Sequence, residues 1–356
     1  MAFPRLSIPS LTSRRRENIA VLDLGSHSVK AVSLQWKRGA YQVIGFAIAK
    51  APDREQLYTP ETLSELFKEI IGKLPGKPKG IAPVLGVDDS VVKQANLPAA
   101  ADADLRAMLK FSSRNYLHQD LKDHCFDCHV LPAEDSVEEG ANRTAVKRPT
   151  IVGATPNSRI HDLSIGAKTA GYTLAHVIPN LIATPNAFER VNPEAFLKEV
   201  LGLVDVGYKN TTITILRQGH LEFSRVVPIG GERITRDLAM ALGCSEEEAE
   251  GIKIGMTEDV QMHMAPILSP LGQELRASID FYEHQSDKSV SNVYFSGGAA
   301  KSDFIVQTLQ TELMITCQQW NASLALPMAL PNELKGEVEP LAPQLAVALG
   351  AAVSII

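Results

Sequence analysis

The segment IAVLDLGSHSVKAVSLQ, residues 19–35, decides the fold of this 356-residue chain. An apolar run up to Leu22 leads to Asp23, Gly25 and a short polar turn, and a second alternating run follows. This pattern predicts two antiparallel strands joined by a tight turn, with a carboxylate at the end of the first strand. Taken alone, it is equally typical of an ordinary β-hairpin.

The residues of this turn suit a phosphate and its metal ion. Gly25 lets the backbone approach a ligand closely, and amide groups together with the hydroxyls of Ser26 and Ser28 can hold a phosphate. Lys30 could balance the phosphate charge, and Asp23 could hold magnesium through water. The turn is therefore a candidate phosphate-binding loop.

Two later segments repeat and complete this design. GLVDVGYKNTTITIL, residues 202–216, again places Asp205 and Gly207 between an apolar strand and an alternating one. VYFSGGAAK, residues 293–301, is an apolar strand that ends in Gly297-Gly298 and opens a helix. The ordered set resembles the actin-like ATPase superfamily. In that fold two related lobes close over a nucleotide, each contributes a phosphate-binding hairpin, and the Gly-Gly turn contacts the adenosine.

Composition indicates a globular protein of two domains or one bilobal unit. Hydrophobic residues make up 45% of the chain, yet no stretch approaches the ~20 apolar residues of a membrane span. The net charge of −6 does not support general nucleic-acid binding. The four cysteines have irregular spacing, which argues against a disulfide framework and favours a reducing cytosol.

Periodicity predicts the elements around the two hairpins. Thr59–Leu74 opens with Thr-Pro-Glu and continues with helical spacing of its apolar residues. Ile81–Val92 has the character of a strand. Ser245 with a glutamate three residues later predicts a capping box at a helix start. Pro343–Ile356 predicts a final apolar helix.

Together with these elements, the resemblance to the actin-like ATPase superfamily implies an α/β, bilobal actin-like ATPase fold with a small α+β subdomain inserted in the first lobe. Residues 1–17 are expected to be a flexible tail. The predicted boundaries are 18–96 and 150–197 for the first lobe, 97–149 for the inserted subdomain, and 198–356 for the second lobe. The second lobe includes an adenosine-contacting subdomain at about 244–292.

The run His124-Cys-Phe-Asp-Cys-His129 has the residue types of a zinc site. We do not interpret it as one, because Cys125 and Cys128 point to opposite faces of a strand. A second ligand pair with suitable spacing is also missing from the sequence.

Several segments resemble one branch of the superfamily, the PilM family of type IV pilus assembly proteins, which are cytoplasmic relatives of the cell-division protein FtsA. The most specific stretch is Ile229–Thr235, IGGERIT, followed by EEAE at 247–250 and by Lys253. Residues 105–131 look like the family's inserted subdomain. The resemblance covers roughly residues 19–355. It implies ATP and Mg²⁺ in the cleft and a scaffold role beneath the inner membrane.

The resemblance also implies a partner. Family members dock a short N-terminal peptide of the inner-membrane protein PilN against the first lobe and the inserted subdomain. We therefore expect a PilN-like partner, bound by the helix 102–117 and the strand 125–131. Self-association stays open. Nucleic acid is not an expected partner, and contact with the inner membrane is expected only through partners, from the cytoplasmic side.

The resemblance assigns roles to residues of both lobes. Asp23 and Asp205 would face each other across the cleft as magnesium anchors. Glu250 and Lys253, neighbours on one helical face, would bracket the ribose and adenine, although without the family they would be read as a solvated ion pair. The full set of implied nucleotide-binding residues is Asp23, Gly25, Ser26, Ser28, Lys30, Asp205, Gly207, Asn210, Thr211, Gly230, Gly231, Glu250, Lys253, Gly297 and Gly298.

The chain departs from the family pattern at several positions. His27 and Tyr208-Lys209 replace small residues of the two loops. Asn180 lies near where actin-like ATPases carry a glutamate that positions the attacking water, and asparagine cannot act as a base. We therefore expect slow or absent ATP hydrolysis and assign no catalytic residue. Glu232 is the acid that could take over.

Two other functions remain open at this point. A small-molecule kinase on the same superfold would need a catalytic aspartate and a substrate-binding set, and the inserted segment offers no obvious one. An FtsA-like membrane-associated polymer would end in an amphipathic helix, whereas the last residues here, AAVSII, have no basic face.

Overall fold

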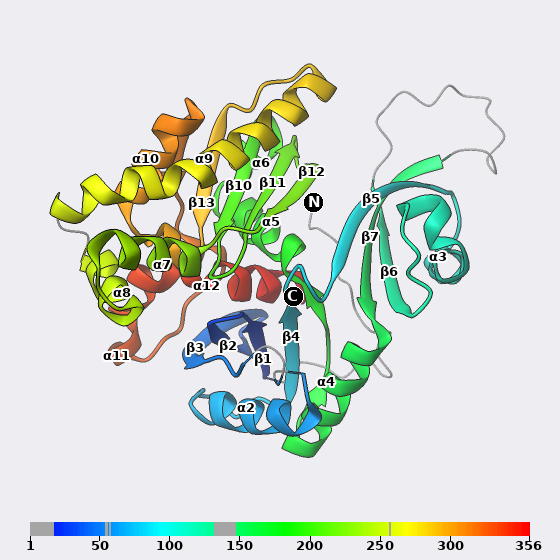
Figure 1. Cartoon of the computed structure of the whole chain (residues 1–356). Coiled ribbons are helices and arrows are strands. Elements are labelled where there is room, and N and C mark those ends of the chain that lie inside the picture. The colour runs from blue at the N-terminus through cyan, green and yellow to red at the C-terminus, as the bar shows by residue number, and fades with distance from the viewer. Residues whose placement is uncertain (1–17, 54–55, 57, 132–146, 256–257) are drawn as a thin grey trace. The chain divides into compact units, whose positions relative to one another are not determined.

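A computed structural model describes residues 18–53, 56, 58–131, 147–255 and 258–356. The predicted tail, 1–17, and residues 132–146 of the inserted segment lie outside the described residues. The chain divides into two units (Figure 1). The first comprises Met1–Asn186, Leu326–Pro331 and Val347–Ile356, and the second comprises Ala187–Ala325 and Asn332–Ala346.

The first unit contains a six-stranded sheet with the order β3-β2-β1-β4-β8, in which β9 also pairs with β4. β1 and β2 form the predicted antiparallel hairpin, and β1 runs parallel to β4. Every residue of β4 is buried, as expected for a parallel strand covered on both faces. The strands are β1 (Ile19–Leu24), β2 (Ser28–Lys37), β3 (Ala40–Lys50), β4 (Gly80–Leu85), β8 (Thr173–Leu174) and β9 (Ile178–Pro179).

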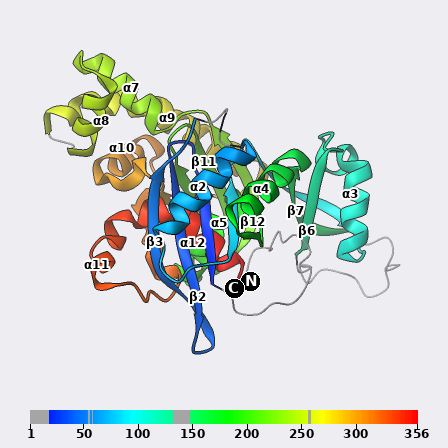
Figure 2. The same cartoon turned by 90° about the horizontal axis from the view of Figure 1, so that it is seen from below.

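Two helices, α2 (Pro60–Gly72) and α4 (Asn157–Ala170), lie side by side along this sheet (Figures 1 and 2). Thr59 caps α2 by accepting a hydrogen bond from the Thr62 amide, and proline occupies the first turn. This confirms the helix start predicted from Thr-Pro-Glu. The apolar faces of both helices join the sheet residues in one hydrophobic core.

The prediction of one strand over Ile81–Val92 is wrong. The chain turns after Leu85, where the Asp89 amide and the Ser90 hydroxyl both donate hydrogen bonds to the Gly86 carbonyl. The following strand therefore enters a different, three-stranded sheet with the order β5-β7-β6. Its elements are β5 (Val91–Pro98), α3 (Asp102–Leu117), β6 (His124–Val130) and β7 (Lys147–Pro156).

Helix α3 packs its Leu105, Leu109 and Leu117 side chains against this small sheet. In β6, Cys128 is buried in the same core whereas Cys125 is exposed, so the two thiols lie on opposite faces as the alternation predicted. The small sheet and α3 thus form an α+β body within the first unit. In the described part of the chain this body starts at Val91 and ends at Pro156.

Ionic and hydrogen-bond contacts around a buried aspartate join the two chain segments that connect this inserted body to the rest of the first unit. Asp89, in the turn that leads out, is 6% exposed and accepts hydrogen bonds from Tyr58 Oη (2.9 Å) and Arg159 Nε (3.1 Å). Arg159 lies at the start of α4, just after the chain returns. Its guanidinium carbon is 4.1 Å from the centre of the Tyr58 ring, a cation–π contact.

The second unit contains a five-stranded sheet with the order β12-β11-β10-β13-β14. The strands are β10 (Val200–Val206), β11 (Thr211–Arg217), β12 (His220–Val227), β13 (Asn292–Ser296) and β14 (Thr316–Gln319). The helices are α6 (Pro193–Lys198), α7 (Gly231–Leu242), α8 (Glu246–Gly255), α9 (Glu258–Ser286), α10 (Asp303–Leu313) and α11 (Asn332–Lys335), with short 3-10 turns at Ala299–Lys301 and Ala322–Ala325. Ser245 and Glu248 form the predicted capping box of α8.

Two helices belong to both units. α5 (Asn180–Val191) and α12 (Val338–Ser354) each begin in one unit and end in the other. Within the first unit they touch closely, because Gly350 packs against the Ala183 backbone and Asn186 Nδ2 donates to Ser354 Oγ (2.6 Å). Among the described residues, no helix is both long and apolar enough to cross a membrane.

The two sheets repeat one design. In both, a β-bulge falls ten residues after the first aspartate, at Ser33 and at Ile215. In both, the next turn has two residues with positive φ, Arg38-Gly39 and Gln218-Gly219, as a type I′ hairpin turn requires. The hairpin that the sequence shows twice therefore belongs to a larger arrangement of strands that is also present twice, once in each unit.

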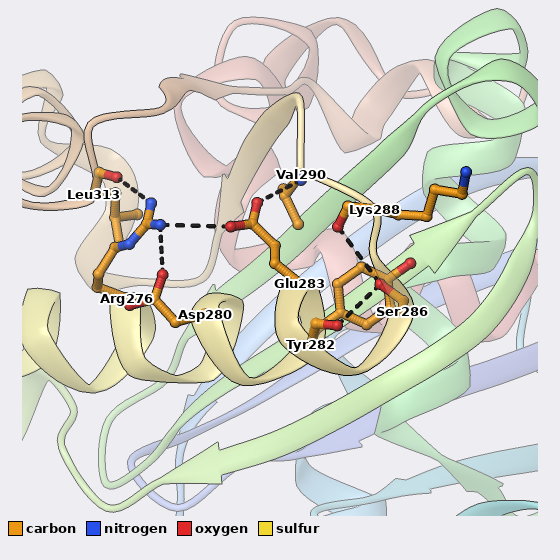
Figure 3. Close-up of polar contacts among 8 residues, drawn as sticks. All are labelled: Arg276, Asp280, Tyr282, Glu283, Ser286, Lys288, Val290 and Leu313. Atoms are coloured by element: carbon orange, nitrogen blue, oxygen red, sulfur yellow. Dashed lines mark hydrogen bonds and ion pairs between the residues drawn. The ribbon is translucent and has the colours of Figure 1, made fainter.

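A polar network holds the end of α9 against the elements that position β13 (Figure 3). Arg276 donates to the Leu313 carbonyl at the end of α10 (2.9 Å) and forms ion pairs with Asp280 and Glu283. Glu283 in turn accepts a hydrogen bond from the Val290 amide (2.8 Å), two residues before β13. The network thus ties the segment that leads into β13, and the end of α10, to α9.

Candidate functional site

The first loop carries an ion pair. Asp23 lies one residue before the end of β1 and directly opposite Lys30 of β2. Its carboxylate oxygen is 3.3 Å from Lys30 Nζ, and the two side chains are 13% and 17% exposed. On its other side Asp23 neighbours Val84 of β4, which offers no polar group. Lys30 therefore neutralises the carboxylate predicted to face magnesium.

Gly25 is required by the shape of the same loop. A Cβ atom at this position would lie 2.7 Å from the Ser28 carbonyl oxygen and 2.8 Å from Lys30 Nζ. Ser26 and Ser28 are half-buried, and the His27 side chain is exposed. Lys30 and the Ser28 carbonyl therefore lie close to Gly25, and the predicted phosphate contacts of Ser26, Ser28 and Lys30 stay predictions.

Asn180 lies at the same edge of the sheet. Val84 of β4 pairs with Asp23 of β1 on one side and with Ile178 of β9 on the other. Gly25 lies two residues after Asp23, and Asn180 lies two residues after Ile178. Because neighbouring strands are about 4.8 Å apart, Asp23 and Ile178 are separated by about 10 Å, and Asn180 follows Ile178 at that edge. The Asn180 Oδ1 atom is buried and accepts no hydrogen bond from the described part of the chain.

The second loop surrounds its aspartate with hydroxyl groups. Asp205 lies opposite Thr212 of β11 and beside Ser296 of β13. Ser296 Oγ donates to Asp205 Oδ1 (3.1 Å). Gly207 repeats the geometry of Gly25, because its Cβ would lie 2.7 Å from the Asn210 carbonyl oxygen. Residues with hydroxyl groups therefore neighbour Asp205 on both adjacent strands.

Thr211 is committed to the interior of the second unit. The residue is fully buried, and its hydroxyl donates to the Ile229 carbonyl (2.6 Å). Its side chain supports the segment that leads into α7. Its predicted contact with phosphate stays a prediction.

Gly230 and Gly231 lie flat against the second loop. The Gly231 and Glu232 amides donate to the carbonyls of Gly207 and Tyr208, both at 2.9 Å. A Cβ at Gly230 would lie 2.4 Å from the Tyr208 carbonyl oxygen. These glycines therefore join the start of α7 to the phosphate loop, and a direct role for them toward a nucleotide stays a prediction.

In the Glu250–Lys253 pair the lysine is buried, whereas the glutamate side chain is 43% exposed. Lys253 is 9% exposed, and its Nζ lies 2.6 Å from Glu250 Oε2 and 2.7 Å from Thr235 Oγ1. Thr235 also contacts the Glu250 carboxylate and connects α7 to α8. Sequence reasoning quoted Thr235 in the IGGERIT stretch but did not give it a role.

Tyr208 is a second residue that the sequence did not mark as a contributor. Burial raises the pKa of its phenol, and the carboxylates of Glu232, Glu246 and Glu250 raise this pKa further. The phenol is thus neutral at pH 7 and lies on the side of the loop that faces the Glu250 network. The signal in the sequence is a large aromatic residue in a loop that otherwise has small ones.

The Gly-Gly turn closes this half of the site. Gly297 has φ +96°, and a Cβ there would lie 2.4 Å from the Val206 carbonyl oxygen, so only glycine fits. Its amide donates to the Pro343 carbonyl (2.8 Å), whereas Gly298 faces Gln344. The turn thus packs directly on the strand that carries Asp205.

The residues present fit a magnesium nucleotide. Within the described residues no cluster of three or more carboxylate, histidine or cysteine side chains could hold a metal alone. Magnesium is commonly held by one or two carboxylates together with water and phosphate oxygens, and Asp205 with its hydroxyl neighbours offers that environment. Lys30 offers a positive charge for phosphate. In each loop a glycine, Gly25 or Gly207, leaves space that the Cβ atom of any other residue would occupy.

Comparisons with known proteins agree with this geometry. The family model described as type IV pilus assembly protein PilM matches residues 21–355. A search of curated proteins finds the cell division protein FtsA of Streptococcus pneumoniae, 22% identical over 262 residues, which are 67% of this chain and 55% of that protein. The chain thus spans about half the length of this curated relative.

Solved structures confirm the predicted actin-like fold. A PilM–PilN type IV pilus biogenesis complex has a chain that matches with a TM-score of 0.81 at 19% identity, covering 96% of this chain and 100% of that chain. MreB5 of Spiroplasma citri bound to AMPPNP matches with a TM-score of 0.50 at 9% identity, covering 96% of each chain. The bilobal α/β architecture is therefore that of the actin-like ATPases.

Proposed function

The chain belongs to the PilM family of type IV pilus assembly proteins, and we propose that it is an ATP-binding scaffold of a type IV pilus or a related secretion machine. One observation carries the nucleotide part of the proposal. Each unit has an aspartate and a glycine at matching positions of a hairpin loop, and in each loop the glycine leaves room that a Cβ would fill. The AMPPNP bound to MreB5 supports a nucleotide as the ligand of such loops.

In this proposal the first loop binds phosphate through Lys30, Ser26 and Ser28. The second loop binds magnesium through Asp205, and the Glu250–Lys253 pair meets the ribose and adenine. Bound ATP and magnesium would supply the charge that orders these side chains. The chain's own contribution is to hold Asp205 and Lys253 in place through Ser296 and Thr235.

The test of nucleotide binding is the melting temperature. Millimolar ATP with magnesium is expected to raise the melting temperature of the protein, because a ligand that binds only the folded state stabilises it by mass action. Ligand at a hundred times its dissociation constant adds about 2.7 kcal/mol. AMP and sodium tripolyphosphate serve as controls for the two ends of the nucleotide. An unchanged melting temperature with ATP would show that the loops are vestigial.

We propose further that the inserted body, residues 91–156, docks the N-terminal peptide of a PilN-like inner-membrane protein. The structural match to a PilM–PilN complex supports the partner class. Two strands, β5 and β6, form the outer strands of the small sheet, and an extended peptide can add to such an edge. The protein would then lie on the cytoplasmic side of the inner membrane, held there by this partner.

Removal of residues 97–149 tests the partner. The deletion joins Asn96 to Thr150, and these ends are close because Ala95 pairs with Thr150 across β5 and β7. We expect complete loss of co-purification with the membrane partner while the ATP-dependent thermal shift persists. A variant that still co-purifies would place the peptide outside the inserted body. If the deletion also removes the thermal shift, an Asn115→Glu variant of the intact chain, at an exposed position of α3, would replace it and is expected to weaken co-purification.

A further inference from the structure

The outer face of α3 presents one large aromatic side chain to solvent. Phe111 is 85% exposed, the highest value among the large exposed hydrophobic residues of the described chain. Small residues, Ala103 and Ala107, occupy the preceding turns of the same face, so nothing on the helix shields the ring. The backbone is irregular just beyond it, because Ser112 has φ −135° and ψ 27° inside the helix.

Basic residues flank this aromatic ring. Lys110 precedes Phe111, and Arg114 and His118 follow one and two turns later on the same exposed face. The acidic residues of α3, Asp102 and Asp104, lie in the first turn, about two turns from the ring. The surface around Phe111 is thus an apolar knob on a positive background, and we name Lys110, Phe111 and Arg114 the knob.

A hollow of complementary character lies on α8 of the second unit. It has a volume of about 550 Å³, within the range of small ligand pockets, and is lined by Cys244, Glu248, Gly251, Ile252 and Gly255. These positions share one face of the helix. The glycines leave the hollow open, since a Cβ at Gly251 or at Gly255 would meet no atom within 4 Å.

Exposed apolar side chains also occur on α8 and on the two helices that precede and follow it in the chain. Met240 of α7, Ile254 of α8 and Met262 of α9 are 69%, 76% and 74% exposed. Flexible methionine side chains are typical of docking surfaces because they adapt to a partner. Soluble proteins expose such groups together mainly where they bind something.

The charge that α8 itself presents beside this hollow is negative, whereas the exposed arginines of α7 are Arg233 and Arg236. Glu246, Glu247 and Glu248 are exposed in the first turn of α8. Hydrogen bonds from the Ser245 amide and hydroxyl lower the pKa of Glu248, so this carboxylate is ionised at pH 7. The one lysine of α8, Lys253, points inward to Thr235 and Glu250. An occupant with an apolar tip and positive flanks is therefore favoured.

We propose that the knob on α3 of one copy of this chain docks into the α8 hollow of a second copy. The aromatic ring would fill the space above Gly251 and Ile252, and Lys110 and Arg114 would meet Glu247 and Glu248. Every copy carries one knob and one hollow. The contact is heterologous, so copies can add head to tail, and both surfaces are separate from the two phosphate loops.

Two surface variants separate the halves of the contact. Phe111→Ser removes the knob and leaves the hollow, and Gly251→Leu fills the hollow and leaves the knob. Neither is expected to unfold the chain, because Phe111 is exposed and Gly251 has free space beyond its Cα. Leu324→Ser, at another exposed hydrophobic residue, is the matched control.

Sedimentation of the full chain over a wide concentration range gives the readout. One aromatic anchor with a few ion pairs predicts weak association, with a dissociation constant on the order of 100 μM. Each variant alone is expected to weaken association at least about tenfold, and Leu324→Ser is expected to match the wild type. An equimolar mixture of Phe111→Ser with Gly251→Leu is expected to form heterodimers, since one knob and one hollow survive.

Charge exchange sharpens the result. Lys110→Glu is expected to weaken association, and addition of Glu247→Lys in the same chain is expected to restore it. The proposal is overturned if the wild type stays monomeric at every concentration, if either single variant associates like the wild type, or if the mixture forms no heterodimer. The ATP-dependent thermal shift, measured on the same samples, reports separately on nucleotide binding.

Discussion

The two candidate phosphate loops follow the same strand pairing but have different polar neighbours. Asp23 and Asp205 occupy matching positions in matching sheets, one opposite Lys30 and the other opposite Thr212. Their neighbours on the parallel strands also differ, Val84 in one unit and Ser296 in the other. Asp23 forms an ion pair with Lys30, and Asp205 accepts a hydrogen bond from the Ser296 hydroxyl.

This difference indicates a division of labour between the loops. A carboxylate that is neutralised by lysine attracts a metal ion weakly, but the lysine remains close to where a phosphate would lie. Asp205 has residues with hydroxyl groups on both adjacent strands, so we propose it as the stronger magnesium ligand of the two. On this proposal the duplicated scaffold would provide one loop for phosphate and one for magnesium.

The strongest test of this comparison is hydrolysis. Asn180 lies at the edge of the first sheet with its amide oxygen buried and without a partner among the described residues. Because a general base contributes typically 10²–10⁴-fold, we expect little hydrolysis in the wild type and a gain of about a hundredfold in Asn180→Glu. Single-turnover hydrolysis of labelled ATP measures both.

Asn180→Gln is the matched control, because it adds the same length without a carboxylate. Wild-type turnover of about one per second, inside the ordinary enzyme range, would contradict the expectation and direct attention to Glu232.

The next test compares the two carboxylates directly. Asp205→Ala is expected to weaken binding of magnesium-ATP at least about tenfold, or ~1.4 kcal/mol, because it removes the charged anchor. Asp23→Ala is expected to weaken it less than about threefold, because Lys30 then becomes available to phosphate. Calorimetric titration of both variants, with and without EDTA, gives the values. Equal losses would mean that the loops share the metal equally.

The smallest expected effect concerns Tyr208, which is a tyrosine in the second loop where the first has Ser26. Its phenol pKa is raised in the folded protein, so its contribution to stability is present below the unfolded pKa of about 10 and is lost as the pH rises through the folded value. Tyr208→Phe is therefore expected to reduce the fall in stability above pH 10. Urea unfolding at several alkaline pH values measures the slope, and identical slopes would contradict the assignment.

The local parts of the site could be predicted from the sequence. The Asp-x-Gly hairpins, the capping box at Ser245 and the Gly-Gly turn depend on residues a few positions apart, where turn chemistry and periodicity act. The family resemblance added the ordered set and correctly identified the actin-like fold.

Contacts across strands could not be predicted in this way. Ser296 donates to Asp205 from 91 residues away, and Thr235 meets Lys253 across two helices. Ile81–Val92 is divided between two sheets because the chain turns at Gly86, where the Ser90 hydroxyl donates a hydrogen bond to the Gly86 carbonyl. The apolar residues on both sides of this turn do not reveal it. Such features follow from packing, which a single sequence does not state.

The cluster of Tyr58, Asp89 and Arg159 has a mechanical consequence. It ties the outgoing and the returning strand of the inserted body at one buried carboxylate. A partner that pulled on the inserted body would transmit the force to both chain connections, through β4 and through α4. The hydrogen bonds of Asp89 with Tyr58 and Arg159 would share that force. Two attachments in parallel resist torque and peeling better than a single tether, so a pull on the inserted body reaches the sheet that carries the first loop.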